Sequence, residues 1–234
     1  MPDALRTTLA DALGPAIVLG EELGGGAMAR VFRARDAALG RDIVVKVLAP
    51  DRAGDVNAER FRREIAVAAS LVHPQVVPVL AAGDAGGMPW YTMPYVAGAS
   101  LAERLAQGAP LARGAATSLL RDVARALAAA HAAGVVHRDV KPGNVLLVGD
   151  AAVVTDFGIA KAVDAARTQA DDGEGARHGA TLTRAGMAVG TPAYMAPEQA
   201  AGDAVDARAD VYAWGVLAYE VLAGRHPFAH AVTA

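Results

Sequence analysis

The chain has 234 residues, of which 53% are apolar and 20% charged, a balance typical of a globular protein. Its 22 basic and 25 acidic side chains give a net charge of −3, which argues against a nucleic-acid or membrane-surface binder, because such proteins carry a basic excess. The absence of cysteine excludes disulfides, thiol catalysis and thiolate metal sites. The N-terminus has an early acid, and the longest uncharged stretch, 65–83, contains two prolines, so neither a signal peptide nor a membrane span is predicted. We expect a cytoplasmic protein, with any membrane anchor confined to a longer product of the same gene.

The first half of the chain predicts a small sheet with one helix. Short apolar or β-branched runs between glycine-rich or polar turns indicate five strands, at 17–24, 29–35, 42–48, 76–81 and 90–96. A helix is predicted over 57–71, where Phe61, Ile65 and Ala68 recur at helical spacing. Together these elements form a coherent α+β unit.

The second half is mainly helical. Helices are predicted over 101–107, 115–133 and 209–223, and Gly134 is a natural C-cap for the second of them. Short strands are expected at 145–148 and 153–155. Residues 162–188 carry no hydrophobic period and many small and polar residues, which indicates a long loop of the kind that often has a function. The boundary between the strand-rich and helical halves falls near 94–98.

Two features of the first half could bind phosphate, and each alone is weak evidence. Gly24 and Gly26 lie in the turn LGGGAMARVF, where the lack of a Cβ lets backbone amides approach phosphate oxygens, although such hairpins are more often structural. Lys46, one of only three lysines, lies in the apolar strand IVVKV, where an edge position is the ordinary alternative. Glu64 on the next helix could pair with it, or could simply be a solvated acid.

The segment HRDVKPGN at 137–144 is the strongest signal. It places an acid, a rare lysine and one of only two asparagines within six residues, and DFG follows twelve residues after Asn144. Asn144 and Asp156 offer the hard oxygen ligands that Mg²⁺ prefers beside substrate phosphates. Asp139 is free to orient a hydroxyl group. An accidental loop composition is a poor explanation for this combination.

With a glycine-rich turn, a strand lysine, a helix glutamate, HRD, DFG and APE in this order, the chain resembles the eukaryotic-type serine/threonine protein kinases, most closely their bacterial members. The resemblance extends from about residue 17 to 230. It implies an α+β, two-lobed fold within a single catalytic domain over 1–234. A small lobe of five antiparallel strands and one helix (17–96) precedes a larger, mainly helical lobe (97–234), in which 159–196 forms the activation and substrate-docking segment.

The resemblance implies roles for single residues. Asp139 accepts or orients the substrate hydroxyl, Lys141 steadies the transferred phosphoryl group, and Lys46, held by Glu64, binds the α- and β-phosphates of ATP. Asn144 and Asp156 hold Mg²⁺, for which Mn²⁺ is a substitute. Met93 resembles the gatekeeper, and the segment after it the hinge. The implied ATP-binding residues are Leu23, Gly24, Gly25, Gly26, Ala27, Val31, Val44, Lys46, Met93, Tyr95, Val96 and Leu146.

The resemblance also implies a substrate class and a mode of regulation. A lysine two residues after Asp139 is typical of kinases that transfer the γ-phosphoryl group of ATP to serine or threonine hydroxyls of proteins. Thr191, in the docking segment GTPAYMAPE, is expected close to Asp139. Arg138 marks the kinases whose activation loop is ordered by phosphorylation, with Thr181 and Thr183 as the candidate sites. The implied partners are ATP, unknown protein substrates and a second copy for phosphorylation in trans, with no nucleic acid.

Three departures from the family pattern leave the catalytic groups in place: Ala29 replaces the third glycine, Val44 replaces a smaller alanine, and Pro94 removes an amide donor from the hinge. Two alternatives remain. A non-catalytic kinase-like binding module or an inactive fragment is the first, although Lys46 and the acids of HRD and DFG are all present. A small-molecule phosphotransferase of related fold is the second, although that family lacks the long loop ending in APE.

The C-terminal part is expected to be incomplete. The helix predicted over 209–223 is apolar on every side, and only ten residues follow Gly224. In the kinase family further helices cover this helix and supply an arginine that pairs with the glutamate of APE, here Glu198; Arg225 is a poor substitute. We therefore expect a C-terminally truncated domain that exposes apolar surface and turns over weakly.

Overall fold

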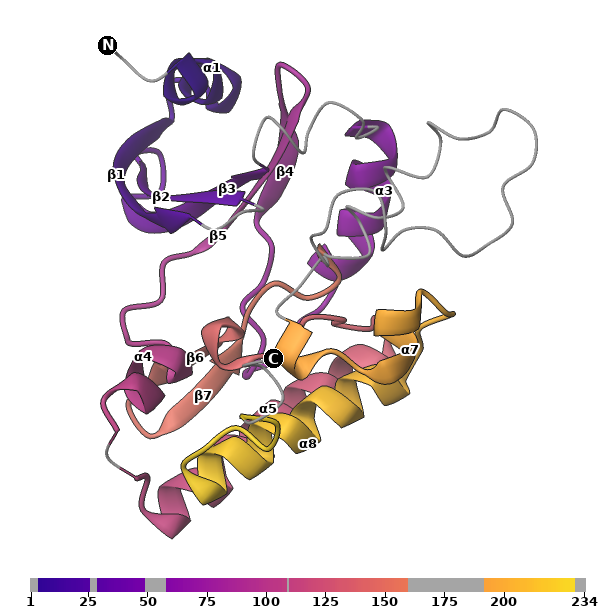
Figure 1. The fold of residues 1–234 in the computed structure, drawn as a ribbon. Coiled ribbons are helices and arrows are strands. Elements are labelled where there is room, and N and C mark those ends of the chain that lie inside the picture. The colour runs from indigo at the N-terminus through magenta and orange to yellow at the C-terminus, as the bar shows by residue number, and fades with distance from the viewer. Residues whose placement is uncertain (1–3, 26–28, 49–57, 109, 160–191, 230–234) are drawn as a thin grey trace, which may run out of the picture. The chain divides into compact units, whose positions relative to one another are not determined.

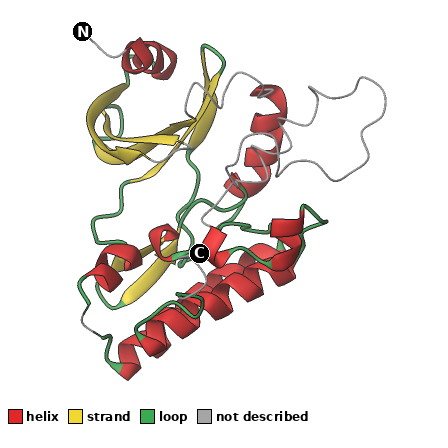
Figure 2. Cartoon of the chain, in the orientation of Figure 1, coloured by secondary structure: helices red, strands yellow, loops and turns green. Residues whose placement is uncertain are grey.

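The computed structural model describes residues 4–25, 29–48, 58–108, 110–159 and 192–229. The described residues fall into two compact units, and the chain passes from the first to the second between Tyr95 and Val96. The segment 71–77 also belongs to the second unit. Figure 1 labels the helices and strands along the chain, and Figure 2 distinguishes them by type.

The first unit is built on an antiparallel sheet with the strand order β1-β2-β3-β5-β4. Its strands are β1 (Ile17–Gly25), β2 (Ala29–Asp36), β3 (Arg41–Leu48), β4 (Ala81–Ala85) and β5 (Met88–Pro94). The β2–β3 ladder is regular from end to end, whereas the β1–β2 register slips twice between Leu19 and Gly24. Because side chains alternate along a strand, the sheet has two faces of different composition.

One face of this sheet is covered by α1 (Ala4–Leu13). Leu5 and Leu9 of this helix are buried in one apolar cluster with Phe32, Ile43 and Val45 of the sheet. The helix contacts β1 and β4, which are the two outer strands in the order, so it bridges both edges of the sheet (Figure 1). The second helix, α3 (Ala58–Ala69), contacts β4 and β5.

The second unit is a helical layer with one hairpin. Its helices are α4 (Leu101–Ala106), α5 (Arg113–Ala132), α7 (Pro197–Ala201) and α8 (Ala207–Ala223), and its hairpin is β6 (Val145–Val148) with β7 (Ala151–Val154). Single 3₁₀ turns occur at Pro142–Asn144 and Pro192–Tyr194. Helix α8 runs along α5, where the Trp214 indole N–H donates to the Leu120 carbonyl at 3.1 Å, and α5 also packs against β7 (Figure 1).

The expected architecture is confirmed, with two corrections. The strand expected at 76–81 is wrong: Val76 and Val77 instead meet Val154 of β7, and β4 begins only at Ala81. Pro78 has no N–H to donate to a ladder, so the apolar run is interrupted there. The helices α1 and α7 were not predicted. The loop expected at 162–188 lies outside the described residues.

Apolar side chains are unevenly covered on α8. Val216, Leu217 and Val221 are buried, whereas Tyr219 and Leu222 are exposed among the described residues.

In the described part of the chain, no helix combines the length and the apolar character needed to cross a membrane.

The role of α1 in the first unit can be tested by truncating its buried leucine. We expect Leu9→Ala to lower the free energy of unfolding by about 2 to 5 kcal/mol, because Leu9 has no exposed surface and its loss leaves a cavity over the sheet. Leu39→Ala is the matched control, since that leucine is 67% exposed. Urea denaturation measures both. Equal, small losses in the two variants would show that α1 is not packed on the sheet.

Candidate active site

The backbone of the HRD segment is held by one buried carboxylate, that of Asp210 in α8. Its Oδ2 accepts the His137 amide and its Oδ1 the Arg138 amide, both at 2.8 Å. Oδ2 also lies 2.7 Å from Nε2 of His131 in α5. Asp210 is only 1% exposed, and a buried carboxylate is tolerated when several donors replace its water. Asp210 therefore attaches the start of the loop 137–144 to both α5 and α8.

The buried His137 ring connects this loop to the end of β7. Its Nδ1 accepts the Asp139 amide at 3.2 Å, so Nε2 must carry the proton and donate to the Thr155 carbonyl at 2.9 Å. The ring also packs against Phe157, with 4.6 Å between ring centroids. These contacts place the residues around Asp139 and those around Asp156 next to each other.

Two polar side chains of the loop converge on the Asp139 carboxylate. Lys141 Nζ donates to Asp139 Oδ2 at 2.6 Å, and Asn144 Nδ2 donates to the same oxygen at 3.0 Å and to the Asp139 carbonyl at 2.8 Å. Asn144 is buried, and Asp139 and Lys141 are half-buried. Because both side-chain bonds use Oδ2, the carboxylate is fixed in orientation while Oδ1 can accept a proton from an incoming hydroxyl.

The two candidate metal ligands lie on adjoining segments. The Thr155 amide donates to the Asn144 carbonyl at 3.0 Å, which brings Asp156 beside the loop. In the described part of the chain, no three His, Cys, Asp or Glu side chains are grouped to hold a metal. The Asn144 amide uses its nitrogen for Asp139, so its oxygen is the atom that could join the Asp156 carboxylate around a cation. Two hard oxygen donors fit Mg²⁺, which completes its shell with water and phosphate oxygens.

Two non-glycine residues of this site have a left-handed backbone. Arg138 has φ 67° and Asp156 has φ 69°. Such conformations cost roughly 1 to 3 kcal/mol each and persist where surrounding contacts impose them. Here the amide of Arg138 is bound by Asp210, and its carbonyl accepts Gln199 Nε2 at 2.9 Å. At Arg138 the strain is thus maintained by bonds from α7 and α8.

The remaining ATP-binding predictions of the second unit are Val96 and Leu146. Both are half-buried, and Leu146 pairs with Ser100 in an isolated bridge. These contacts attach the segment after Val96 to the β6–β7 hairpin, which directly follows the loop.

A cavity of about 530 Å³ opens beside Lys141, and its lining includes Leu105, Tyr194, Glu220 and Val221. The Tyr194 hydroxyl donates to Glu220 Oε2. Burial, and then the neighbouring carboxylate, raise the pKa of Tyr194, so its hydroxyl keeps its proton to a higher pH than an exposed tyrosine does.

In the first unit, cross-strand pairing places the predicted nucleotide-binding side chains on one face of the sheet. Val31 pairs with Lys46, and Val44 pairs with Met93. By the alternation of the strands, these four side chains lie on the face opposite to the one that α1 covers. Val44 and Met93 are buried and Lys46 is half-buried. A common face is what a nucleotide base and its phosphates require.

The remaining predictions for this unit have mixed outcomes. Leu23 is 45% exposed, and Gly24, with φ 149°, pairs with Val31 beside Gly25. Glu64 is half-buried on α3, in the same unit as Lys46, and an ion pair between the two stays a prediction. Along the whole chain, five predicted positions lie outside the described residues: Gly26 and Ala27 of the glycine-rich turn, and Thr181, Thr183 and Thr191 much later in the sequence.

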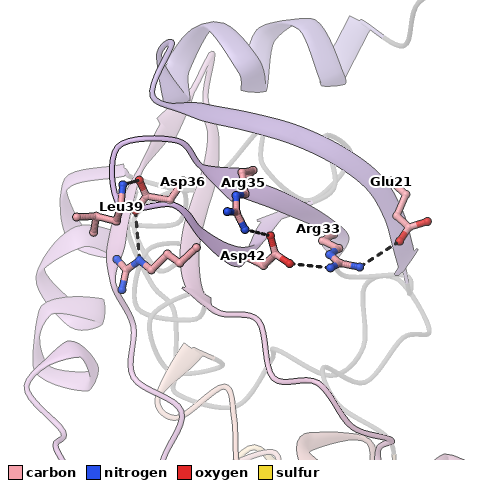
Figure 3. Close-up of polar contacts among 7 residues, drawn as sticks. Glu21, Arg33, Arg35, Asp36, Leu39 and Asp42 are labelled. Atoms are coloured by element: carbon pink, nitrogen blue, oxygen red, sulfur yellow. Dashed lines mark hydrogen bonds and ion pairs between the residues drawn. The ribbon is translucent and has the colours of Figure 1, made fainter.

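The expected hinge residue Tyr95 is held by a surface network. Arg33 donates to Asp42 Oδ2 at 2.6 Å and its guanidinium lies 4.5 Å from the centre of the Tyr95 ring. The Tyr95 amide donates to the Asp42 carbonyl at 3.2 Å. Figure 3 shows Asp42 between Arg33 and Arg35, and Arg33 extending towards Glu21. The hydrogen bonds from Arg33 and then Arg35 lower the pKa of Asp42, so the network persists above the carboxyl's ordinary pKa and weakens as the pH falls towards the lowered value.

Sequence reasoning missed two residues that position the site. Asp210 opens an apolar helix, where an acid in the first turn is usually explained by the helix dipole. Gln199 follows APE, and its side chain accepts the Ala196 amide while it donates to the Arg138 carbonyl. Only the three-dimensional structure brings these residues, 61 and 72 positions later in the chain, to Arg138.

Comparisons with known proteins agree with this geometry. The family model described as protein kinase domain matches residues 17–234. The serine/threonine-protein kinase PknB of Mycobacterium tuberculosis is 43% identical over 216 residues, which are 90% of this chain and 33% of PknB. A probable serine/threonine-protein kinase of Streptomyces coelicolor is 42% identical over 222 residues, 92% of this chain and 31% of the relative. The crystal structure of a mutant Mycobacterium tuberculosis PknI kinase domain aligns with a TM-score of 0.70 and 32% identity, covering 91% of this chain and 76% of that one.

The chain belongs to the protein kinase domain family, and it is close to bacterial serine/threonine kinases. Its fold is the kinase fold, with a five-stranded antiparallel sheet in one unit and a mainly helical second unit. It spans about a third of the length of the curated relatives that it matches.

The anchoring role of Asp210 makes a stability prediction. Asp210→Ala should lower the free energy of unfolding by about 2 to 5 kcal/mol, because it leaves the buried amides of His137 and Arg138 without an acceptor. Asp150→Ala, in the exposed β6–β7 turn, is the control and should change it by less than about 0.5 kcal/mol. Chemical denaturation followed by circular dichroism measures both. An Asp210→Ala variant as stable as the control would contradict the anchoring role.

Proposed function

We propose that this chain is an ATP-dependent protein serine/threonine kinase catalytic domain, with residues 17–96 and 97–234 as its two lobes and 159–196 as its activation and docking segment. One observation carries the proposal most directly. The Asp139 carboxylate is oriented by Lys141 and Asn144 through a single oxygen, on a loop bound to the segment that carries Asp156. Membership of the protein kinase domain family supports the same function.

The proposed reaction needs positioning and charge neutralisation more than covalent chemistry by the protein. The substrate hydroxyl oxygen forms a bond to the γ-phosphorus of ATP as the bond to the β-phosphate oxygen breaks and ADP leaves. Asp139 Oδ1 orients the hydroxyl and accepts its proton, while Lys141 stabilises the charge on the phosphoryl oxygens. Asn144 and Asp156 would hold Mg²⁺, which supplies further neutralisation of phosphate charge when bound. Lys46 would bind the α- and β-phosphates, and the hinge at Tyr95 and Val96 the adenine.

The cavity beside Lys141 supports a polypeptide substrate. Its apolar lining by Leu105 and Val221 and its polar edge at Glu220 and Tyr194 suit a segment of peptide with mixed side chains. A hydroxyl carried by such a segment would lie close to Asp139, because Lys141 contacts both the cavity and that carboxylate.

The state of Arg138 supports regulation by phosphorylation. Its guanidinium makes one long contact, at 3.4 Å to the Val205 carbonyl, and its Nε is buried without a hydrogen-bond partner among the described residues. A phosphate group would supply the missing acceptor. We propose that Thr181 or Thr183 provides this phosphate after autophosphorylation, with a second copy of the chain acting in trans.

Two substitutions test the catalytic proposal. Lys46→Arg and Asp156→Asn should each reduce phosphate transfer from labelled ATP to a generic protein substrate by roughly two orders of magnitude or more. The first replaces a compact ammonium by a planar fork, and the second removes the charge that would bind Mg²⁺. Asp150→Asn, in the exposed turn, is the control and should transfer at the original rate.

Two results would contradict the catalytic proposal, and each refutes a different part of it. Transfer at the control rate by either variant would refute the role assigned to that residue. Binding of MgATP by the unaltered chain without any transfer would favour a nucleotide-binding module over an enzyme.

The regulatory proposal predicts where phosphate accumulates. After incubation with MgATP, phosphopeptide mapping should find Thr181, Thr183 or both, and the double alanine variant should lose most of the activity gained on incubation. Arg138→Lys should lose the same gain, because an ammonium cannot bind phosphate in the bidentate manner. Phosphate found only outside 162–191 would refute this part of the proposal.

A further inference from the structure

The helix α1 lies outside the part of the chain that the family model matches, yet it is integral to the first unit. The match begins at residue 17, and α1 ends at Leu13. Two of its leucines are buried against the sheet, and Thr8 approaches the β4–β5 turn at Gly86. The helix is thus positioned to influence a sheet that the family uses for nucleotides, although nothing in the kinase pattern assigns it a role.

Arg6 of this helix reaches the strand that leads into the glycine-rich turn. Its Nη2 donates to the Leu19 carbonyl at 3.0 Å and to the Gly20 carbonyl at 2.6 Å. Hydrogen bonds from a charged donor are among the stronger ones in proteins. Arg6 therefore attaches two successive carbonyls of β1 to α1.

These carbonyls lie where β1 departs from a regular ladder. Leu19 pairs with Ala34 and Glu22 with Phe32, so β1 contains one residue more than β2 over this stretch, and a second extra residue precedes the pair of Gly24 with Val31. An extra residue interrupts the ladder and lets the strand bend. Arg6 thus binds β1 where the backbone bonds alone fix it least.

A second contact links the same place to the turn. Glu22 accepts two bonds from Arg30, at 2.9 and 2.7 Å, across the hairpin. The guanidinium groups of Arg30 and Arg6 lie 5.1 and 5.9 Å from the centre of the buried Phe32 ring. Phe32 therefore connects α1 to both strands of the hairpin, directly beside the pair that Gly24 forms on β2.

We propose that Arg6 is a positioning residue for nucleotide phosphates: by binding the irregular stretch of β1, α1 sets the direction in which the strand enters the glycine-rich turn at Gly24. This inference rests on the proposed kinase function. It predicts a much larger effect on ligands that carry phosphates than on ligands that lack them, because the hydrogen bonds to adenine would come from Tyr95 and Val96, on another segment of the chain.

The experiment compares MgATP with adenosine on the full chain. Arg6→Met keeps the aliphatic stem and helix propensity but removes the donors, and should weaken MgATP binding by roughly three- to tenfold while changing the adenosine dissociation constant by less than about twofold. Arg6→Lys retains a charged donor and should recover most of the MgATP affinity. Arg113→Met, at an exposed position of α5, is the matched control and should leave both constants unchanged.

The outcomes separate the inference from the function on which it rests. If the unaltered chain does not bind MgATP, the proposed function is wrong. If it does, and Arg6→Met weakens both ligands equally or neither, the positioning role is wrong, because a general loss of structure would affect adenosine as well. Hydrogen exchange gives a second reading: in Arg6→Met, amides of residues 19–25 should exchange faster while those of β3 stay protected.

Discussion

The candidate active site depends on a single buried carboxylate. Asp210 accepts two successive backbone amides of the HRD segment and contacts His131 of a second helix, so the loop cannot move without breaking several bonds in the interior. From this fixed start, the His137 ring donates to the Thr155 carbonyl, next to Asp156. The Asp139 carboxylate accepts hydrogen bonds from Lys141 and Asn144. The geometry of the candidate active site is therefore imposed by the helical core and does not arise within residues 137–144 alone.

The left-handed residues Arg138 and Asp156 show what this anchoring achieves. Both conformations are unfavourable for residues with a Cβ. Arg138 directly precedes Asp139, and Asp156 itself carries the second carboxylate that the proposed function uses. The fixed partners of the Arg138 backbone would remove the reorganisation that a mobile site would need during the proposed reaction. In the first unit the side chains are positioned by a different means. Strand alternation alone places Val31, Val44 and Lys46 on one face of the sheet and the core covered by α1 on the other.

Local patterns made most of the fold and much of the site predictable. Alternation and helical spacing located the main strands and helices, and the rare residues Lys46 and Asn144 are among those predicted for the candidate site. What local patterns could not show depends on distant contacts. Val76 and Val77 are apolar because they pack against β7 and not because they lie in the sheet, and Asp210 looks like an ordinary first-turn acid until its partners, more than 70 residues away, are seen. Helix α1 was missed because it precedes residue 17, where the resemblance to the kinase pattern begins.

The central claim is that Asp210 fixes the start of the loop 137–144. Amide hydrogen exchange at residues 137 and 138 tests this claim most directly. If the claim is right, these two amides should be protected to nearly the same degree as those in the middle of α8, because they open only when the core opens. Their protection should fall by at least roughly tenfold in Asp210→Asn, which retains one acceptor oxygen in place of two. Exchange in the unaltered chain as fast as that of Gly149 and Asp150, in the exposed turn, would contradict the account.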